Sequence, residues 1–564
     1  MSGFDRHCLT KDHTRCSQDA CIANNLDEST YETRHASVGC CCAHMGQESE
    51  TSALIAGMLQ SASIPVIQVS LPTDDSGGDL VISVEKSTRA PYVAISHVWS
   101  DGLGNPRDNT LPKCQLRRLQ SYVDSLYPES SSRPVPFWID TICVPGQTDL
   151  RRTAIWLMAQ TYKAADKVLV IDDWLTQTGF NGNGSLDLLK LKSCTWTERL
   201  WTLQESILTQ THQLYFQTPQ GPIAEDQIYG DFTLHQGARF MANLIGSDSD
   251  SLQEAHPDAA NAMIRAVERI QDIYTKFLEH LQGDDDTDSD PIFPWKGDHR
   301  ILNLVDSWFA HGFVWVEGRD YFSEMRWPGG RKPNEVPVTE ANAVLIIGDC
   351  MRFRSTSRIE DELICLATLL GQDLKDLLGE PSVEERMKLV VSKIRHVPAG
   401  ILFSPRPRID VDGFRWAPLS FRAATVGKAY SPGVSFTTVA QVRPEGLLAR
   451  LDGIVLELHD SFKVGSEFLV SMGPDRLPVR MRGQITYAGG GVGNALALIV
   501  WGSSAVWPRT RSDAVLVEIQ RMEEDIVFTR LRAHYFMGPS VQEETNSVRI
   551  IPGRIMQKQQ WCVG

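Results

Sequence analysis

The chain has 564 residues, of which 42% are hydrophobic and 22% are charged, so it is long enough for about two to four globular domains. Its 55 basic and 70 acidic residues give a formal net charge of −15. That balance argues against a dedicated nucleic-acid-binding protein, because such proteins take much of their affinity from clustered lysine and arginine. No apolar run approaches the roughly 20 residues of a membrane-spanning helix, and residues 1–10 lack the apolar core of a secretory signal. We therefore expect a cytoplasmic protein with no membrane span and no nucleic-acid partner.

Cysteine is distributed unevenly along the chain. Of the 12 cysteines, six fall within the first 42 residues, and histidines are interleaved with them. Disulfides are rare in the reducing cytoplasm, so we expect thiols or metal ligands. A Cys/His set can hold zinc, but the Cys-x4-Cys spacing is looser than the usual Cys-x2-Cys, and ordinary reduced thiols are the favoured alternative. The candidate zinc ligands are Cys16, Cys21, His35, Cys40 and Cys42.

Strand-like and helix-like stretches alternate between residues 61 and 220. The strand-like stretches are short apolar runs at residues 92–98, 135–142, 167–171 and 212–217. Between the second and the third, residues 150–165 carry Ile155, Met158, Ala159 and Tyr162 at helical spacing, and Thr148 or Asp149 is suited to cap that helix. This order predicts an α/β domain with a doubly wound, mostly parallel sheet.

The rest of the chain divides into three regions by its sequence pattern. Residues 1–60 form the Cys/His-rich segment, which ends in a helical stretch near residues 52–60. Residues 221–435 have mainly helical patterns, among them 262–281, 360–370 and 383–395, and include an acidic run at 283–290 that is typical of a solvated loop. Residues 436–564 contain short β-rich runs broken by Gly, Pro and Asp, which predicts a mostly antiparallel β domain.

Polar residues lie at the ends of three strands of the predicted parallel sheet. Ligands of such sheets bind beyond the carboxyl ends of the strands, where the βα loops meet. The residues delivered to that edge are Ser96, His97, Trp99 and Asp101 by the first strand-like stretch, Asp140, Thr141 and Cys143 by the second, and Asp172 and Asp173 by the third. We therefore expect a site there, with simpler roles left open. Asp140 can cap its own loop, Trp99 is compatible with a core position, and Cys143 has no histidine partner by spacing and fits a buried thiol.

Residues 196–208 have the pattern of one amphipathic helix. Trp196, Leu200, Leu203 and Ile207 share a stripe, which we expect to be buried. Glu205 then lies nearly opposite, on the face of Trp201. A solvated face is the usual place for a helical glutamate, but the large aromatic beside it indicates a pocket wall or an interface. Arg199 is either a substrate contact or an ion-pair partner of a nearby acid.

Three blocks of this region are similar, in order and spacing, to the signature blocks of the fungal heterokaryon-incompatibility (HET) domain. They are Tyr92-Val-Ala-Ile-Ser-His-Val-Trp99, Trp138-Ile-Asp-Thr-Ile-Cys143 and Trp196-x-x-Arg199-x-Trp201-x-x-Gln-Glu205. The resemblance covers roughly 120 of the 564 residues. The chain departs from the family at His97 and Ser100, where Tyr and Gly are usual, and at residues 144–147, which replace a common Ile-Asn-Gln.

HET domains are in turn distantly similar to Toll/interleukin-receptor (TIR) domains. Trp201-Thr-Leu-Gln-Glu205 is similar to the Trp-Cys-x-x-Glu of enzymatic TIR domains, whose glutamate takes part in cleaving NAD. The resemblance implies that Glu205 is catalytic, that NAD is the substrate, and that no cofactor is required. The residues it implies around the substrate are Ser96, Trp99, Asp101, Asp140, Cys143, Arg199 and Trp201. Breaking the nicotinamide–ribose bond builds positive charge on the sugar, which one carboxylate can stabilise.

Two functional hypotheses follow from these resemblances. In the first, the chain is an incompatibility-type protein of programmed cell death or innate-immune-like signalling, whose HET domain cleaves NAD with Glu205. In the second, the HET domain is not catalytic and acts by self-association or by binding protein partners, with Trp201 and Glu205 at the interface. A further arrangement keeps the HET fold as a scaffold and places recognition in the C-terminal β domain.

Overall fold

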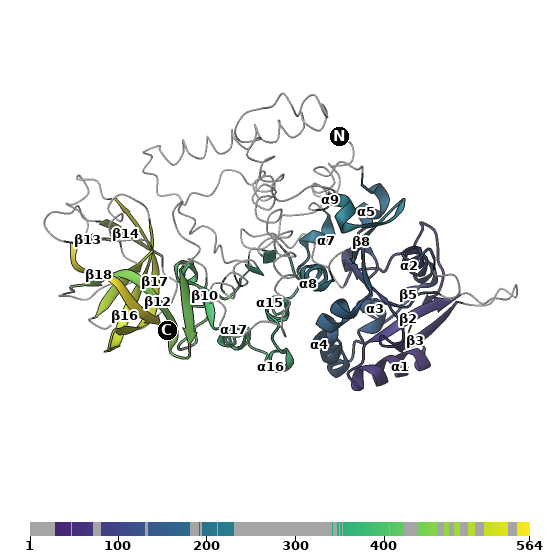
Figure 1. The fold of residues 1–564 in the computed structure, drawn as a ribbon, viewed down its shortest axis with the longest axis horizontal. Coiled ribbons are helices and arrows are strands. Elements are labelled where there is room, and N and C mark those ends of the chain that lie inside the picture. Colours follow the sequence, from purple (N-terminus) through teal and green to yellow (C-terminus); the bar gives the residue numbers. More distant parts are fainter. Residues whose placement is uncertain are drawn as a thin grey trace, which may run out of the picture. The chain divides into compact units, whose positions relative to one another are not determined.

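A computed structural model describes the chain in two compact units. The described residues are 29–46, 48–70, 80–129, 134–180, 191, 194–210, 213–229, single helical positions between 341 and 351, 354–404, 407–421, 438–458, 467–472, 479–484, 495–501, 512–539 and 550–564. Unit 1 comprises the described residues up to Tyr229 together with 354–357, and unit 2 comprises the others (Figure 1). Cys16, Cys21, the helical pattern at 262–281 and the acidic run at 283–290 lie outside the described residues.

Unit 1 is built on a seven-stranded sheet with the order β3-β2-β6-β4-β7-β8-β9. The four central strands β6, β4, β7 and β8 run parallel, and the outer strands pair antiparallel. The strands are β2 (Pro65–Ser70), β3 (Val81–Lys86), β4 (Val93–His97), β6 (Phe137–Trp138), β7 (Lys167–Ile171), β8 (Leu214–Thr218) and β9 (Gly221–Ala224). The predicted parallel arrangement thus holds for the centre of a mixed sheet, while β2 and β3 were not predicted.

Strand β4 is the central strand, and all five of its residues are buried. A strand covered on both faces is normally a continuous apolar run, which makes the two polar residues at its carboxyl end, Ser96 and His97, unusual. The parallel register places Ser96 beside Val170 and His97 beside Ile171 of β7. The other neighbour, β6, is shorter than the predicted strand 135–142, because the chain turns into the helix α3 (Asp140–Cys143) directly after Ile139.

Helices cover both faces of this sheet. The helices are α1 (Ser49–Gln60), α2 (Lys113–Ser125), α3, α4 (Thr148–Ala164), α5 (Asp173–Thr178), α7 (Thr195–Glu198), α8 (Leu200–Leu208) and α9 (Glu225–Tyr229), with a 3-10 turn η1 (Trp99–Asp101). Helix α4 contacts α1 and α8, so these three lie on one face. Right-handed crossovers place α2, which links β4 to β6, on the opposite face, and Figure 1 shows it away from α1 and α4.

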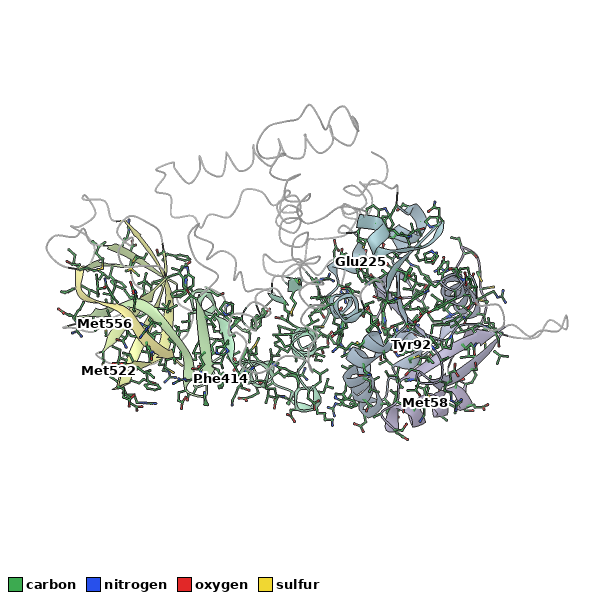
Figure 2. All side chains as sticks on the ribbon, viewed as in Figure 1. Met58, Tyr92, Glu225, Phe414, Met522 and Met556 are labelled. Atoms are coloured by element: carbon green, nitrogen blue, oxygen red, sulfur yellow. The ribbon has the colours of Figure 1, made fainter. Side chains whose placement is uncertain are left out.

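Helix α4 largely follows its sequence pattern. Met158 and Tyr162 are buried as predicted, whereas Ile155 and Ala159 are half-buried at the margin of the stripe. The helix begins at Thr148, so Gln147 occupies the cap position and the predicted cap, Thr148 or Asp149, is wrong. Figure 2 shows the described side chains. Among them is Tyr92, the residue before β4, which is 1% exposed.

The predicted single helix over residues 196–208 is wrong. It is two helices, α7 and α8, which are separated at Arg199, where the backbone is extended (φ −91°, ψ 142°). A distant segment fills the gap: the Leu200 amide donates to the Ser355 carbonyl at 2.9 Å, and the Ser355 amide donates to the Glu198 carbonyl at 2.7 Å. The buried guanidinium of Arg354 adds a hydrogen bond of 2.8 Å to the Arg199 carbonyl.

The break at Arg199 changes which side chains α8 buries. Leu200 and Leu203 are buried as predicted, but Ile207 is half-buried and Glu205 is buried. The buried residues of α8 lie on more than one face, because the helix packs against α4 as well as the sheet and the segment 354–357 covers its start. The predicted position of Glu205 on a face opposite the core is therefore wrong.

The described part of unit 2 contains a second, larger sheet, which follows the single helical positions between 341 and 351 and three continuous helices in the chain. The helices α15 (Asp361–Leu369) and α17 (Val383–Ser392) lie within two predicted helical stretches, and α16 (Lys375–Gly379) and the 3-10 helix η2 (Ala399–Phe403) complete this part. The strands are β10 (His396–Pro398), β11 (Val439–Arg443), β12 (Gly446–Leu456), β13 (Phe468–Ser471), β14 (Val479–Gln484), β15 (Leu496–Val500), β16 (Ser512–Glu523), β17 (Ile526–Pro539) and β18 (Ile550–Val563).

The unit 2 sheet is mostly antiparallel, as predicted, and it closes on itself. Strand β18 pairs antiparallel with β12 and parallel with β13 and β17. The closure encloses an apolar core that includes Ile454, Leu498 and Tyr535. Within the described parts of the chain, no helix has the length and apolar character needed to cross a bilayer.

Candidate functional site

The order of the parallel strands identifies one edge of unit 1 as the expected place for a site. After β4 the chain adds β6 on one side, and it then crosses to the other side to add β7 and β8. The winding direction therefore reverses between β4 and β7. In sheets of this kind, the loops that leave adjacent strands in opposite directions open a crevice at the carboxyl edge. The residues at that point are Ser96 and His97 at the end of β4.

The first group at this edge joins Ser96 to Glu205. The Ser96 hydroxyl donates a short hydrogen bond to Glu205 Oε2. The same Ser96 oxygen accepts a hydrogen bond of 2.6 Å from the indole nitrogen of Trp196. Helix α8 supplies Glu205 and α7 supplies Trp196, so these two helices, which lie between β7 and β8 in the chain, converge on the end of β4. Ser96 is fully buried, and Glu205 is 8% exposed.

The carboxyl group of Glu205 is tuned by this burial. Desolvation raises its pKa to about 7, and the negative charge of Asp140 acts in the same direction. The Ser96 hydrogen bond, the positive charge of His97 and a hydrogen bond from Tyr162 act against the increase. Tyr162 itself stays protonated, because burial and then the charge of Glu205 raise its pKa well above the ordinary value. Glu205 is thus a carboxyl group that exchanges a proton near neutral pH.

The second group joins His97, Asp140 and Trp99. Asp140 Oδ1 lies 2.8 Å from His97 Nε2, and its Oδ2 accepts a hydrogen bond of 2.8 Å from the Trp99 indole nitrogen. Asp140 is the first residue of α3, and Thr141 donates a further hydrogen bond of 3.2 Å to it. The two carboxylate oxygens of Asp140 therefore tie the loop after β4 to the loop after β6.

His97 and Asp140 each favour the charged form of the other. Burial opposes a charge on His97, but the charge and hydrogen bond of Asp140 outweigh it and raise the His97 pKa. Burial likewise opposes a charge on Asp140, and the opposing effects of His97 and Trp99 lower its pKa. His97 Nδ1 is buried and has no hydrogen-bond partner among the described residues.

The two groups differ in their access to solvent. The Asp140 side chain is 32% exposed, while the His97 side chain is 2% exposed. Ser96 and Glu205 lie deeper, and the Coulombic effect of Asp140 on Glu205 shows that the groups are close. Asp140 and Trp99 are therefore the more exposed residues of the site, and Ser96 and Glu205 are buried beneath the surface.

Four other predicted site residues lie apart from this core. Asp101 Oδ2 accepts a hydrogen bond of 3.0 Å from the Asp173 amide and so joins the loops after β4 and β7. Cys143 is fully buried, and burial raises its pKa to about 12, so it is a thiol and not a nucleophile. Arg199 lies at the break between α7 and α8, and its guanidinium reaches Ser357 at 3.4 Å. Trp201 is half-buried against the core of unit 1.

Two contributors to the site, Trp196 and Tyr162, were not assigned to it from the sequence, whereas Asp172 was expected at this edge because it follows the third predicted strand. Trp196 and Tyr162 were assigned to buried helical faces, and only their polar atoms, directed at Ser96 and Glu205, give them a part in the site. Asp172, at the end of β7, caps α5 through hydrogen bonds to Trp174 and Leu175. Its Oδ2 also accepts a hydrogen bond of 3.1 Å from the Trp196 amide. Polar atoms on otherwise apolar residues were the signal that could have identified Trp196 and Tyr162.

The N-terminal segment lies over the loop that carries Trp99. The Tyr31 hydroxyl donates to the Trp99 carbonyl at 2.7 Å and accepts from the Gly104 amide at 3.0 Å. Thr33 donates to the Gly104 carbonyl at 2.7 Å, and the Arg34 amide donates to the Gly102 carbonyl at 2.9 Å. Residues 31–34, hereafter the strap, thus cover the backbone of the site loop.

A cluster of metal-ligating side chains follows the strap. His35, Cys40, Cys42 and Cys114 place their ligand atoms within 4.8 Å of one another, a set that can hold a metal ion. Three of these residues are among the predicted zinc ligands. Cys114 was not predicted, since it stands alone in the sequence 72 residues after Cys42.

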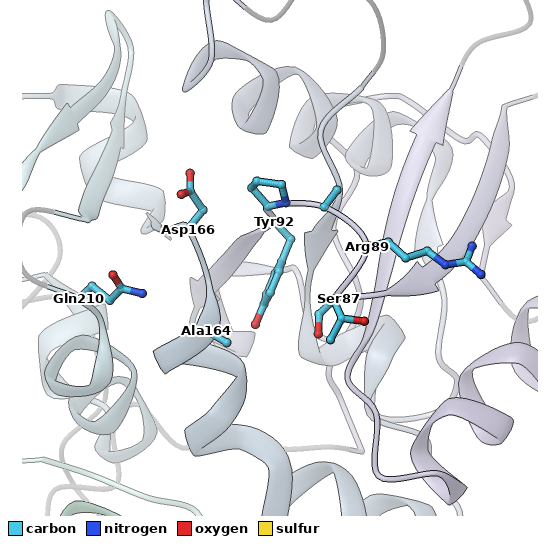
Figure 3. A pocket seen from close by; sticks show the side chains of 9 residues that line it. Ser87, Arg89, Tyr92, Ala164, Asp166 and Gln210 are labelled. Carbon is cyan, nitrogen blue, oxygen red and sulfur yellow. The ribbon is translucent and has the colours of Figure 1, made fainter. Parts of the chain in front are cut away.

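A separate hollow lies at the opposite edge of the sheet. It has a volume of about 410 Å³ and lies at the amino ends of the parallel strands, between Tyr92, Asp166 and Gln210 (Figure 3). None of the predicted site residues lines it. Because ligands of parallel sheets bind at the carboxyl edge, we do not assign the function to this hollow.

Comparisons of the chain with family profiles, with curated proteins and with solved structures find no match.

Proposed function

We propose that unit 1 is a HET-type, TIR-like domain that cleaves NAD at the nicotinamide–ribose bond, within a protein of incompatibility-type cell-death or immune-like signalling. One observation carries the proposal: the buried Glu205 accepts a hydrogen bond from Ser96 and has a pKa of about 7. It lies where the winding direction of the parallel strands reverses. The three sequence blocks that resemble HET domains support it, because each contributes to this one edge.

The chemistry assigns different parts to the two carboxylates. As the bond between ribose C1 and the nicotinamide nitrogen breaks, its electron pair leaves with nicotinamide, which becomes neutral, and positive charge builds on the sugar. The ionised Glu205 stabilises that charge. A water oxygen then bonds to C1, and Glu205 takes the proton that this water releases, which its pKa of about 7 permits. The products are ADP-ribose, nicotinamide and one proton.

Asp140 would bind the ribose rather than react with it. His97 and Trp99 hold its carboxylate in place, and its 32% exposure leaves it accessible to a sugar hydroxyl. A substrate that enters over Asp140 meets Glu205 behind it. The ring of Trp99 beside Asp140 is suited to stack on nicotinamide.

Nicotinamide release from NAD by the purified full-length chain tests the proposal. Glu205→Gln is expected to lower kcat/KM by at least about 100-fold, as for other charge-stabilising groups. Glu198→Gln is the matched control, because it makes the same change in the preceding helix, and it is expected to retain wild-type activity. Turnover that survives Glu205→Gln would remove Glu205 from the mechanism.

The alternative is a domain that acts without catalysis, by self-association or partner binding. Glu205 contributes little surface to an interface because it is 8% exposed and faces Ser96, so the interface would depend on Trp201 and its neighbours. Wild-type protein that releases no nicotinamide at any concentration, yet forms oligomers that Trp201→Ala abolishes, would favour this alternative.

A further inference from the structure

The ligand atoms of His35, Cys40, Cys42 and Cys114 are spaced as the ligands of a tetrahedral metal site are. His35 Nδ1 lies 3.5 Å from Cys42 Sγ and 3.5 Å from Cys114 Sγ. With Zn–S bonds of about 2.3 Å and Zn–N bonds of about 2.0 Å, tetrahedral angles separate sulfur and nitrogen by about 3.5 Å. The observed separations are therefore those that a bound zinc ion requires. All four ligand atoms lie within 4.8 Å of one another.

The fold brings these residues together through a short sheet. Strand β1 (His44–Met45) pairs antiparallel with β5 (Leu111–Pro112), with His44 opposite Pro112. Continued by two residues, this register sets Cys42 opposite Cys114, and the Lys113 amide donates to the Ala43 carbonyl at 3.0 Å to extend the pairing. Cys114 is thus placed by strand pairing, although it is distant in the sequence.

Local geometry supplies the other two ligands. The Cys40 amide donates to the Ser37 carbonyl at 3.3 Å, and Gly39 adopts φ +83°, so the chain turns back between His35 and Cys40. Alternate residues of an extended chain point to the same side. Cys40 and Cys42 accordingly join the cluster, while Cys41 between them is exposed and takes no part in it.

Backbone amides point at two of the sulfur atoms. The Ala36 amide donates to Cys114 Sγ at 3.2 Å, and the Cys114 amide donates to Cys42 Sγ at 3.3 Å. Outer contacts of this kind orient metal ligands and stabilise thiolate charge. Three thiolates and one imidazole prefer zinc to magnesium or calcium, which bind oxygen ligands.

We propose that His35, Cys40, Cys42 and Cys114 bind one zinc ion, and that this ion holds the strap on the loop that carries Trp99. His35 directly follows the strap, whose Tyr31, Thr33 and Arg34 bond to the backbone of residues 99–104. Gln115, next to Cys114, donates to the Arg34 carbonyl at 2.8 Å and so supports the same attachment. The ion would thereby control the order of the site loop while lying outside the site.

Metal content of the full-length chain, purified without chelator, tests the site. Wild type and Cys41→Ser are expected to carry one equivalent of zinc, and Cys114→Ser and His35→Ala are expected to lose it. Cys41→Ser is a matched control because it removes a thiol from the same triplet of cysteines. Cobalt added to zinc-stripped wild type is expected to give tetrahedral d–d bands and a thiolate-to-cobalt charge-transfer band, a result that does not depend on any variant folding.

Hydrogen exchange tests the effect of the ion on the loop. Removal of zinc is expected to accelerate exchange of the Arg34 and Gly104 amides by roughly tenfold or more, with no change in β7. A wild type without metal in which Cys40, Cys42 and Cys114 are free thiols, a different metal in the site, or equal zinc in Cys114→Ser would overturn the zinc assignment. Unchanged exchange after zinc removal would overturn the control of the loop. Neither result depends on whether the chain cleaves NAD.

Discussion

The carboxyl group of Glu205 makes the stability of unit 1 depend on pH in a specific way. In the folded chain its pKa is about 7, raised from the ordinary value of 4.5 mainly by burial. Between these two values the unfolded chain ionises while the folded chain holds its proton. The stabilisation is therefore fully present below about pH 4.5 and is lost as the pH rises toward 7. Glu205→Gln removes the titration, because the amide stays neutral at every pH.

The size of the effect follows from the pKa difference. A shift of about 2.5 units corresponds to about 3 kcal/mol at roughly 1.4 kcal/mol per unit. The free energy of unfolding of the wild type, relative to Glu205→Gln, should therefore fall by about 3 kcal/mol between pH 4.5 and 7 and stay level at higher pH. For a unit of about 200 residues this is a relative change in Tm of roughly 6 to 12 °C.

Differential scanning calorimetry of the full chain measures this difference. The unit 1 transition of wild type and Glu205→Gln is followed from pH 4 to pH 9, and the difference between the two Tm values is plotted against pH. Other groups titrate in both proteins and largely cancel in the difference. Glu50→Gln, the same change at an exposed position of α1, is the control for removal of one carboxylate.

Two outcomes would refute the reasoning. A flat difference for Glu205→Gln would mean that the carboxyl group has the same pKa folded and unfolded, and a difference of opposite sign would mean that Glu205 is ionised and paired in the folded chain. If catalysis needs ionised Glu205, the same group makes kcat/KM increase with pH up to about 7 and then level off.

Other side chains give independent predictions. Asp140→Asn should lower the His97 pKa, because it removes the largest effect that opposes burial and leaves only the weaker effects of Glu205 and Asp101; an NMR titration that finds no decrease would contradict the pairing with Asp140. Gly104→Ala should displace Trp99, because a Cβ at Gly104 would lie 2.4 Å from the indole ring. Chemical denaturation should show that unit 1 is destabilised by about 1–3 kcal/mol. An unchanged free energy of unfolding would show that the ring can move freely. Arg408→Met should destabilise unit 2 by about 3 kcal/mol, because the buried guanidinium donates to the carbonyls of Leu402 and Ser404 at 2.6 and 2.7 Å. Calorimetry should show the unit 1 transition unchanged. An equal decrease in the Tm of both transitions would contradict separate units.

The sequence predicted the parts of unit 1 that local pattern determines. Strand β7 was predicted at its observed bounds, because Lys167–Ile171 is a short apolar run between polar residues. The carboxyl edge was also predicted: Ser96, Trp99 and Asp140 follow two strands whose parallel pairing fixes where they meet. Predicting this edge required only the positions of the strands along the chain, which the alternation of strand-like and helix-like stretches indicates.

The parts that were missed depend on contacts between distant residues. The break at Arg199 is made by Ser355, whose position nothing in the helical pattern of residues 196–208 indicates. Cys114 joins the metal cluster through the pairing of two-residue strands, which are too short to be recognised by alternation. Glu205 was assigned to an outer face because one buried stripe was expected, whereas α8 is covered on more than one face; the hydrogen bond of Glu205 to Ser96 could not be inferred from spacing.

The contact of residues 354–357 with α7 and α8 has a mechanical consequence. Ser355 is bonded on both sides of Arg199, and Arg354 donates to the Arg199 carbonyl. Arg358, the next residue, is assigned to unit 2. Any change in the backbone of residues 354–357 therefore acts directly on the start of α8, the helix that carries Glu205.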